Sequence, residues 1–336
     1  MRRAALGLAA GVAAAGWEAA RRADRRALER DPLRERLAVL PRGRVQPVAA
    51  PDGTQLHVEV HGPDGGPTIV LTHGWTCTTD FWALQVQDLV AAGLRVVTWD
   101  LRGHGLSGRP ASGDYAMERF AEDLAAVLDA TLADRQRAVV AGHSLGAMTI
   151  VALAAEHPEV VRERLAAAAL VNTGVGDLVS ESLVVRAPAT VTNVVGRLML
   201  EARAPIPGVS TPISHRLVRH IALCPDAPPA AVAFSERLVG DCHPHVRAGV
   251  GATLTRLELH EGLEHLAVPT TVIAGGDDRL TPPVHAERMA AELPQLVELC
   301  VLPKTGHMAP LERDADVSSR LRALVHDHLQ MAATAA

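Results

Sequence analysis

Aromatic residues are scarce in this chain, where Phe, Tyr and Trp together make up 2% of 336 residues. Proteins that stack nucleic-acid bases place aromatic side chains among Lys and Arg, and the sequence has no such cluster. The net charge of −5 also opposes contact with phosphates. No Gly-x-Gly-x-x-Gly or phosphate-loop motif follows a predicted strand. We therefore expect no nucleic acid as a partner, and no nucleotide or other cofactor.

Cysteine and histidine give no metal-binding pattern. The cysteines are scattered without the spacing of metal ligands, at Cys77, Cys224, Cys242 and Cys300. We interpret them as ordinary thiols, although a bridge between Cys224 and Cys242 stays open. Six of the 16 histidines lie between positions 215 and 265, but their spacing does not match a zinc motif. We therefore predict no metal site.

The N-terminus has no apolar run of transmembrane length. Residues 4–17 are uncharged, and 14 residues in a helix span about 21 Å, against about 30 Å of hydrocarbon. Arginines precede the run and crowd the region behind it, which suits a signal-peptide cleavage site poorly. We expect residues 1–30 to form a surface or membrane-associated helix with peripheral membrane contact. The protein is then cytoplasmic or membrane-associated, and secretion with residues 1–30 as a signal stays open.

What the chain does contain is a Gly-x-Ser-x-Gly pentapeptide, Gly142-His143-Ser144-Leu145-Gly146. The apolar run 138–141 precedes it, and the stretch 145–157, rich in Ala and Leu, follows it, so strand, turn and helix come in order. On such a turn the serine takes an unfavourable backbone conformation, and only glycine at both flanking positions leaves room. The pattern predicts a nucleophile elbow that exposes the hydroxyl of Ser144.

A serine hydroxyl needs a base to take its proton and an acid to orient that base. A predicted strand, 270–274, ends shortly before Asp277 and Asp278, and another, 297–302, ends before His307. The order Ser, Asp, His is that of α/β-hydrolases. Only His307 combines a strand end, a preceding glycine and this position in the order, so we predict it as the base. His143 should point away from Ser144, because adjacent residues diverge on a turn.

With these motifs the chain resembles the α/β-hydrolase fold superfamily, in its serine esterase and lipase-like branch, over about residues 45–330. The resemblance also rests on Thr72-His73-Gly74-Trp75 after the strand 68–71, and on Asp100-Leu101-Arg102-Gly103-His104-Gly105-Leu106-Ser107 after the strand 94–99. It implies an α/β fold, a mostly parallel doubly wound sheet with a helical cap insertion.

The resemblance also implies roles for individual residues. In that family an aspartate four residues before a proline is commonly the triad acid, which assigns Asp278, with Asp277 in reserve. The backbone N–H groups of Trp75 and Leu145 would form the oxyanion hole, where fixed donors stabilise the charge of the tetrahedral intermediate. His73, Gly74, Gly142 and Gly146 would support the site, and His104 would brace it.

We divide the chain into four parts. Residues 1–40 form an N-terminal apolar and basic helical segment, 41–174 and 266–333 form the two parts of the core, and 175–265 form the cap. The cap interval lacks alternating strand patterns and contains many prolines, among them those at 188, 205, 207, 212, 225, 228 and 229. Helices are predicted at 230–239 and 246–260, covering the edge where open α/β sheets bind ligands.

The apolar cap composition favours an apolar ester as substrate, because burying apolar groups favours binding. We therefore expect a serine hydrolase that cleaves a carboxylic ester of an apolar small molecule. Relatives with these motifs also include lactonases, carbon–carbon bond hydrolases, perhydrolases and aminopeptidases, and the sequence leaves these open. A non-catalytic binding protein of the same fold is the alternative from another class. The oligomeric state is not evident from the sequence.

Overall fold

The computed structural model describes residues 2–184, 189–203 and 210–330. Its centre is an eight-stranded sheet within these residues, in the order β1-β4-β6-β5-β7-β8-β9-β10. The six strands from β6 to β10 in this order pair in parallel, whereas β1 and β4 are antiparallel to their neighbours. A short hairpin, β2 (Val48–Ala49) with β3 (Gln55–Leu56), stands apart from the sheet. The predicted α/β fold with a mostly parallel sheet is confirmed.

The strands of the parallel part follow the apolar runs of the sequence. The sheet consists of β1 (Arg44–Val45), β4 (Val58–His61), β5 (Thr68–Thr72), β6 (Arg95–Trp99), β7 (Ala138–His143), β8 (Leu165–Val171), β9 (Thr270–Gly275) and β10 (Leu296–Leu302). The five strands predicted at 68–71, 94–99, 138–141, 270–274 and 297–302 are therefore confirmed to within two residues at each end. The strands inside the sheet form where both faces are buried, which demands continuous apolar stretches, whereas the edge strand β10 is partly exposed.

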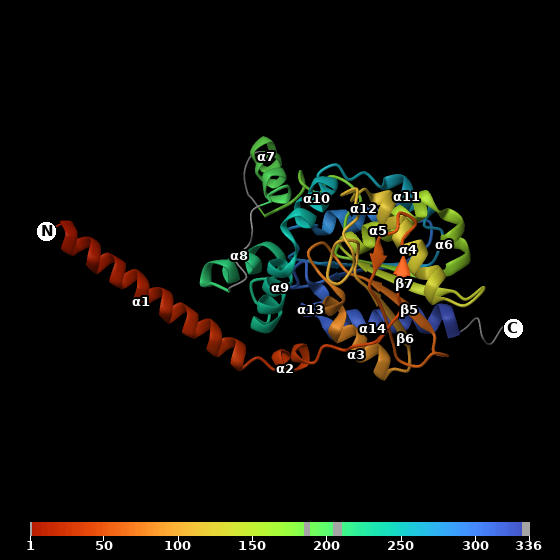
Figure 1. The fold of residues 1–336 in the computed structure, drawn as a ribbon, viewed down its shortest axis with the longest axis horizontal. Helices are drawn as coiled ribbons and strands as arrows, with labels where there is room; N and C mark the ends of the chain where they lie inside the picture. Colours follow the sequence, from red (N-terminus) through yellow and green to blue (C-terminus); the bar gives the residue numbers. More distant parts are fainter. Residues whose placement is uncertain (1, 185–188, 204–209, 331–336) are drawn as a thin grey trace.

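Helices cover both faces of this sheet (Figure 1). Alternate residues of β5 show the two faces, because Ile69 and Leu71 join one buried cluster and Val70 joins the other. The cluster of Ile69 includes side chains of α3 (Ala83–Ala91) and α14 (Asp314–Val325). The cluster of Val70 includes α4 (Met117–Thr131), α5 (Leu145–Glu156), α6 (Pro158–Arg164) and α12 (Pro283–Glu292). Shorter turns are η1 (Thr79–Trp82), α13 (Ala309–Glu312) and η2 (His326–Gln330).

The interval 175–265 is helical and contains no strand in the portion that the structure describes. Its helices are α7 (Ala189–Leu200), α8 (Pro212–Ala222), α9 (Pro229–Asp241), α10 (Pro244–Leu254) and α11 (His260–His265). The helix predicted at 230–239 lies within α9. The helix predicted at 246–260 corresponds to α10, but its predicted C-terminal end is wrong. Helix α10 stops at Leu254, and the N–H of Leu259 donates instead to the carbonyl of Val175, at 2.7 Å. Pro188, Pro205 and Pro207 lie outside the described residues.

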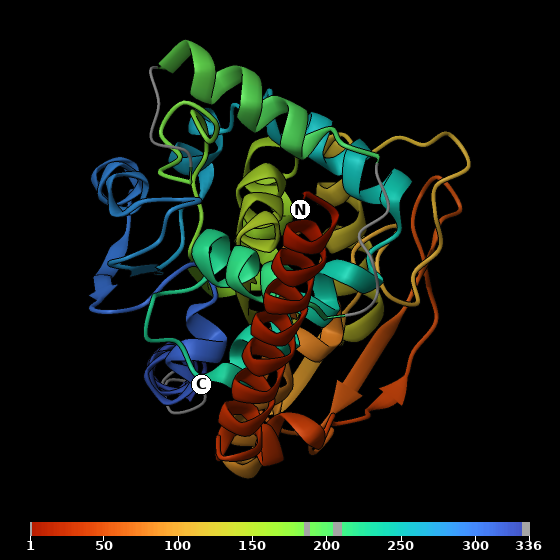
Figure 2. The ribbon, with the colours of Figure 1, turned by 90° about the vertical axis from the view of Figure 1, so that its left-hand side faces the viewer.

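The N-terminal residues form one long helix, α1 (Arg2–Glu29), followed by α2 (Leu33–Ala38). Helix α1 contacts α8 and α9, and Figure 2 shows it crossing in front of them. Arg216 on α8 pairs with Asp24 at 3.4 Å, and the N–H of Ala230 donates to Asp31 at 2.8 Å. None of the helices in the described residues has the length and apolarity needed to cross a membrane.

Candidate active site

Ser144 occupies the tight turn between β7 and α5. Its backbone has φ 51° and ψ −116°, in the left-handed range that non-glycine residues rarely adopt. A Cβ on Gly142 would lie 2.4 Å from the backbone N of Ala147, and one on Gly146 would lie 2.2 Å from the carbonyl oxygen of Thr72. Both flanking glycines are therefore required by the backbone, as the elbow pattern predicts.

His307 and Asp278 are brought together from two different loops. Asp278 follows β9, His307 follows β10, and these strands are parallel neighbours, so their loops leave the sheet at the same edge. His307 Nδ1 lies 2.8 Å from Asp278 Oδ2. Asp278 is buried, with 1% of its surface exposed, whereas Asp277 is exposed and makes no contact with His307 that the described residues show. The geometry thus selects Asp278 over Asp277 as the partner of the imidazole.

The carboxylate of Asp278 is held in its charged form. Burial raises the pKa of this carboxyl, but the charge of His307 and the hydrogen bonds from His307, Thr281 and Asn172 outweigh burial, so its pKa lies below the ordinary value. The N–H groups of Leu280 and Thr281 donate to Oδ1 at 2.9 and 3.0 Å. A carboxylate satisfied in this way fixes the orientation of the imidazole and stabilises its protonated form.

Ser144 and His307 line one cavity of about 290 Å³. Within the described chain no hydrogen bond joins the Ser144 hydroxyl to His307, and catalytic hydrogen bonds are often long before substrate binds. The core contributes Trp75, Thr76, Cys77, His143, Ser144, Met148, Leu280, Thr281, His307 and Met308 to the wall. The interval 175–265 contributes Leu178, Val179, Ser182, Val184, Gly196, Leu200, Val218, Ile221, Ala222, Val239, Arg247 and Leu254. Most of the lining side chains are thus aliphatic, and Ser144 and His307 are among the polar ones.

The two predicted oxyanion donors are without an acceptor. Neither the backbone N–H of Trp75 nor that of Leu145 bonds to any group in the described part of the chain. Leu145 is the first residue of α5, where the helix dipole favours negative charge. A Cβ on Gly74 would lie 2.6 Å from His143 Nδ1, so only glycine allows the chain to approach the elbow this closely. The indole N–H of Trp75 donates to the carbonyl of Arg247 on α10, at 3.1 Å.

Three other histidines near the site are neutral bracing groups. His73 Nδ1 donates to the carbonyl of Gly74 at 2.8 Å, and Nε2 accepts from the N–H of Leu101 at 3.1 Å. His143 Nε2 donates to the carbonyl of His307 at 2.8 Å, so this ring contacts His307 rather than Ser144, although it also lines the cavity. Burial lowers the pKa of His143 to about 3 and that of His104 to about 4. Burial also lowers the pKa of His73, and the lowered pKa of each ring keeps it neutral and makes it a poor proton acceptor at neutral pH.

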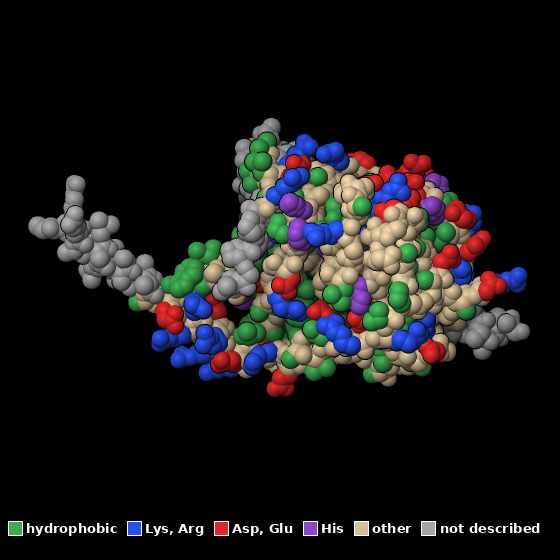
Figure 3. Space-filling view, viewed as in Figure 1, with side chains coloured by type: hydrophobic (Ala, Val, Ile, Leu, Met, Phe, Trp, Pro, Cys, Tyr) green, Lys and Arg blue, Asp and Glu red, His purple; other side chains and the backbone are tan. Residues whose placement is uncertain are grey.

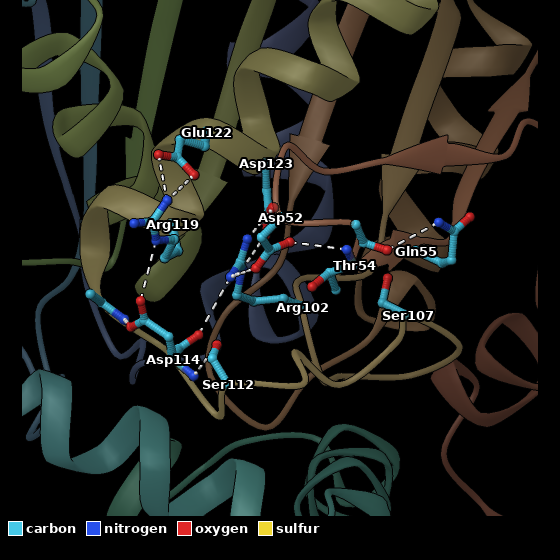
Figure 4. Close-up of polar contacts among 12 residues, drawn as sticks. Asp52, Thr54, Gln55, Arg102, Ser107, Ser112, Asp114, Arg119, Glu122 and Asp123 are labelled. Carbon is cyan, nitrogen blue, oxygen red and sulfur yellow. Dashed lines mark hydrogen bonds and ion pairs between the residues drawn. The ribbon is translucent and has the colours of Figure 1, made fainter.

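The loop after β6 is anchored by Arg102, whose side chain is fully buried (Figure 4). Its guanidinium donates two hydrogen bonds of 2.7 Å to the two oxygens of Asp123 on α4 and a third, of 3.0 Å, to Asp52. In the same loop Asp100 accepts from the N–H of Thr79, at 2.7 Å. The loops that carry Trp75 and His104 are therefore tied to each other and to the core.

Sequence reasoning missed three residues that touch the site. Asn172 Nδ2 donates to Asp278, the hydroxyl of Thr281 donates to the same carboxylate at 2.9 Å, and the hydroxyl of Thr173 donates to the carbonyl of Ser144 at 3.0 Å. Asn172 and Thr173 directly follow β8, whose carboxyl end meets the sheet edge of the site. Their polarity after an apolar strand was the signal that could have identified them.

Comparison with known proteins places these features in one family. The family model described as "alpha/beta hydrolase fold" matches residues 67–314, which include the elbow, Asp278 and His307. The chain belongs to the alpha/beta hydrolase fold family. This alpha/beta hydrolase has the sheet, the turn at Ser144 and the two strand-end loops in the order that its sequence predicts.

Relatives of this alpha/beta hydrolase include hydrolases of several substrate classes. A protein of Variovorax paradoxus, provisionally named a carbamate hydrolase, is 32% identical over 75% of this chain and 89% of its own length. A bifunctional esterase/perhydrolase of Acinetobacter calcoaceticus is 25% identical over 83% of this chain and 98% of its own. A crystal structure from Burkholderia cenocepacia, provisionally called an aryl esterase, superposes with a TM-score of 0.69 at 25% identity, covering 85% and 100% of the two chains. The chain is thus similar to hydrolases throughout its core.

Proposed function

We propose that this enzyme is a serine hydrolase that cleaves a carboxylic ester of an apolar small molecule through an acyl-enzyme intermediate. The observation that carries the proposal is the 2.8 Å contact between His307 Nδ1 and Asp278, on the wall of the apolar cavity that Ser144 also lines. An elbow serine, an oriented imidazole and a buried carboxylate are the three groups that nucleophilic acyl transfer needs.

In the first half of the reaction His307 Nε2 takes the proton of Ser144 as the hydroxyl oxygen attacks the ester carbonyl. The Nδ1–H of His307 stays bonded to Asp278, which stabilises the positive charge of the imidazole. The N–H groups of Trp75 and Leu145 receive the oxygen that becomes negative. His307 then gives its proton to the leaving alcohol, and the acyl group stays on Ser144.

In the second half water attacks the acyl-enzyme. His307 removes a proton from the water, and the second tetrahedral intermediate collapses with return of that proton to Ser144 Oγ. The carboxylic acid then leaves the cavity. One donor of an oxyanion hole typically lowers the barrier by about 3 kcal/mol, so the two backbone N–H groups supply a large part of the rate.

The cavity wall supports an apolar acyl or alcohol group. Side chains from the interval 175–265 are mostly aliphatic, among them Leu200, Val218 and Ile221. Each Å² of apolar surface removed from water favours binding by about 25 cal/mol. The similarity to a protein named as an esterase and perhydrolase supports the same class of substrate.

The test is hydrolysis of p-nitrophenyl esters of increasing acyl length by the wild type and by Ser144→Ala. We expect the alanine variant to lose about a thousandfold or more in kcat, as removal of an activated serine does. Ser182→Ala is the matched control, because Ser182 also lines the cavity but its hydroxyl donates to the carbonyl of Arg279. Equal activity of wild type and Ser144→Ala on every ester would refute the serine mechanism. Activity on lactones alone would instead assign the site to lactone substrates.

A further inference from the structure

Exposed apolar side chains gather on one side of this molecule. Helix α7 exposes Val194 and Leu198 at 60% and 67%, and helix α8 exposes Ile213 and Leu217 at 66% and 51%. Trp17 on α1 and Leu183, shortly before α7, are exposed as well. Figures 1 and 2 agree in placing α1, α7 and α8 on the same side of the molecule, and Figure 3 shows hydrophobic side chains over α7 there. Single exposed apolar residues are ordinary, but a group of them on one side of the molecule marks an interaction surface.

The same three helices carry positive charge on a negative protein. Helices α1, α7 and α8 contain nine arginines and three acidic residues, a net charge of +6. The whole chain carries −5, so the remaining residues sum to −11. Figure 3 shows part of this charge as Lys and Arg side chains beside Asp and Glu along the C-terminal half of α1. An asymmetry of this size directs the three helices towards a negatively charged partner.

Helix α1 has the composition of a helix that lies in a membrane interface. Fourteen uncharged residues, 4–17, separate two arginines from a segment that holds Arg21, Arg22, Arg25 and Arg26. The apolar part is too short to cross a bilayer, but an interfacial helix needs only to bury one face at the headgroup level. Helix α1 is joined to α8 by the ion pair of Arg216 with Asp24, so both can meet one surface together.

Helices α7 and α8 also border the active-site cavity. Leu200 of α7 and Val218 and Ile221 of α8 line the cavity, whereas Leu198 and Leu217 are exposed on the outside. A partner that binds the exposed faces of these helices therefore contacts the same helices that line the active-site cavity. We call the exposed residues Trp17, Val194, Leu198, Ile213 and Leu217, together with Arg21, Arg22, Arg25 and Arg26 of α1, the docking surface.

We propose that the docking surface binds an anionic lipid bilayer. Apolar side chains enter the headgroup region while the arginines contact negatively charged lipids, a contribution of about 1 kcal/mol for each basic residue near the membrane. A second copy of this chain is a poor occupant, because a symmetric contact would place two positively charged surfaces against each other. A bilayer satisfies both the apolar and the basic parts of the surface.

The test is cosedimentation of the full-length protein with vesicles of phosphatidylcholine alone and of phosphatidylcholine mixed with phosphatidylglycerol. We expect binding to the mixed vesicles, weaker binding to phosphatidylcholine alone, and a decrease as salt is added, because salt screens the arginines. Vesicle binding is measured without substrate, so its result does not depend on ester cleavage.

Two variants locate the contact. Ile213→Glu combined with Leu217→Glu should lower the partition coefficient for mixed vesicles by about tenfold or more. Val45→Glu combined with Val297→Glu is the matched control, since it changes the charge equally at residues that are 55% and 52% exposed on β1 and β10. Circular dichroism checks that both variants keep the wild-type fold.

Equal binding of the two double variants would overturn the proposal, as would absence of binding to mixed vesicles. Light scattering of the protein in solution tests whether a second copy of the chain binds the docking surface. The wild type could instead form a dimer that the double variant Ile213→Glu, Leu217→Glu does not form, and show no vesicle binding. That result would assign the surface to a second copy and overturn the proposal of bilayer binding.

Discussion

Asn172 Nδ2 donates to Asp278 Oδ2 across 3.0 Å and to the carbonyl of Gly306 across 3.1 Å. One amide group therefore joins the carboxylate to the residue that precedes His307. Asn172 lies at φ 46°, a left-handed conformation that asparagine tolerates better than most residues. The position of Asp278 relative to His307 is thus held from the end of β8, whose neighbour β9 precedes Asp278.

We expect Asn172→Gly to lower kcat by about tenfold to a hundredfold with little change in KM, because a small misplacement of the catalytic pair acts on the chemical step. Glycine removes the amide and accepts the left-handed backbone, so folding is preserved. Steady-state kinetics on the best ester measure the effect. A change in KM alone would show that Asn172 acts on binding and not on the position of Asp278.

Asp278→Asn and Asp277→Asn should differ strongly. The first replaces the carboxylate that orients His307 and should lower kcat by about 10⁴-fold, as loss of the acid does in other serine enzymes. The second alters an exposed side chain and should leave kcat within about twofold. Steady-state assays of the two variants in parallel measure the loss of kcat in each. A larger loss in Asp277→Asn than in Asp278→Asn would make Asp277 the acid.

Gly142→Ala should destabilise the fold by about 3 kcal/mol, because its Cβ would lie 2.4 Å from the backbone of α5. Gly240→Ala in α9 is the control, since its Cβ would meet nothing within 4 Å and alanine favours the helix by about 0.5 kcal/mol. Urea unfolding of both variants measures the difference. Equal free energies of unfolding for Gly142→Ala and the wild type would contradict the tight contact between β7 and α5.

Stability should depend on pH through His104. Its folded pKa of about 4 lies below its ordinary value of 6.5, so the unfolded chain binds a proton first as pH falls. The wild type should therefore lose stability from about pH 6.5 down to about pH 4. Relative to His104→Asn, it should lose about 2 kcal/mol between pH 7 and pH 5.

Urea unfolding of wild type and His104→Asn at the two pH values measures this loss. Asp100, whose pKa burial raises to about 6, titrates in both proteins. His73, whose pKa the neighbouring His104 lowers, is the group whose titration the substitution also changes. A stability difference that does not change with pH would mean that His104 is accessible to protons in the folded protein.

The parallel sheet was predictable because each of its strands is a short apolar run that ends in polar or glycine-rich residues. Ala138 to Ala141 before the elbow and Thr270 to Ala274 before Asp278 both form strands as predicted. The elbow was predictable because its backbone conformation demands glycine at fixed positions. These are local requirements, which a sequence records directly.

The remaining features depend on contacts between distant residues. Helix α10 ends early because Leu259 bonds to Val175, a contact that no periodicity of 246–260 records. Asn172 becomes important only because β8 and β9 are neighbours, which places it beside Asp278. The cavity wall likewise combines side chains from helices that lie far apart in the sequence. The sequence pattern places groups along the chain, and tertiary packing decides which of them meet.

The cavity has two kinds of wall. Ser144, His307 and Trp75 stand on turns fixed by the sheet, whereas Leu200, Val218 and Val239 come from helices of the interval 175–265. New side chains in those helices can then change the preference for one acyl chain over another. Directed evolution of this enzyme could therefore be restricted to α7 through α10, with the bond-breaking groups left untouched.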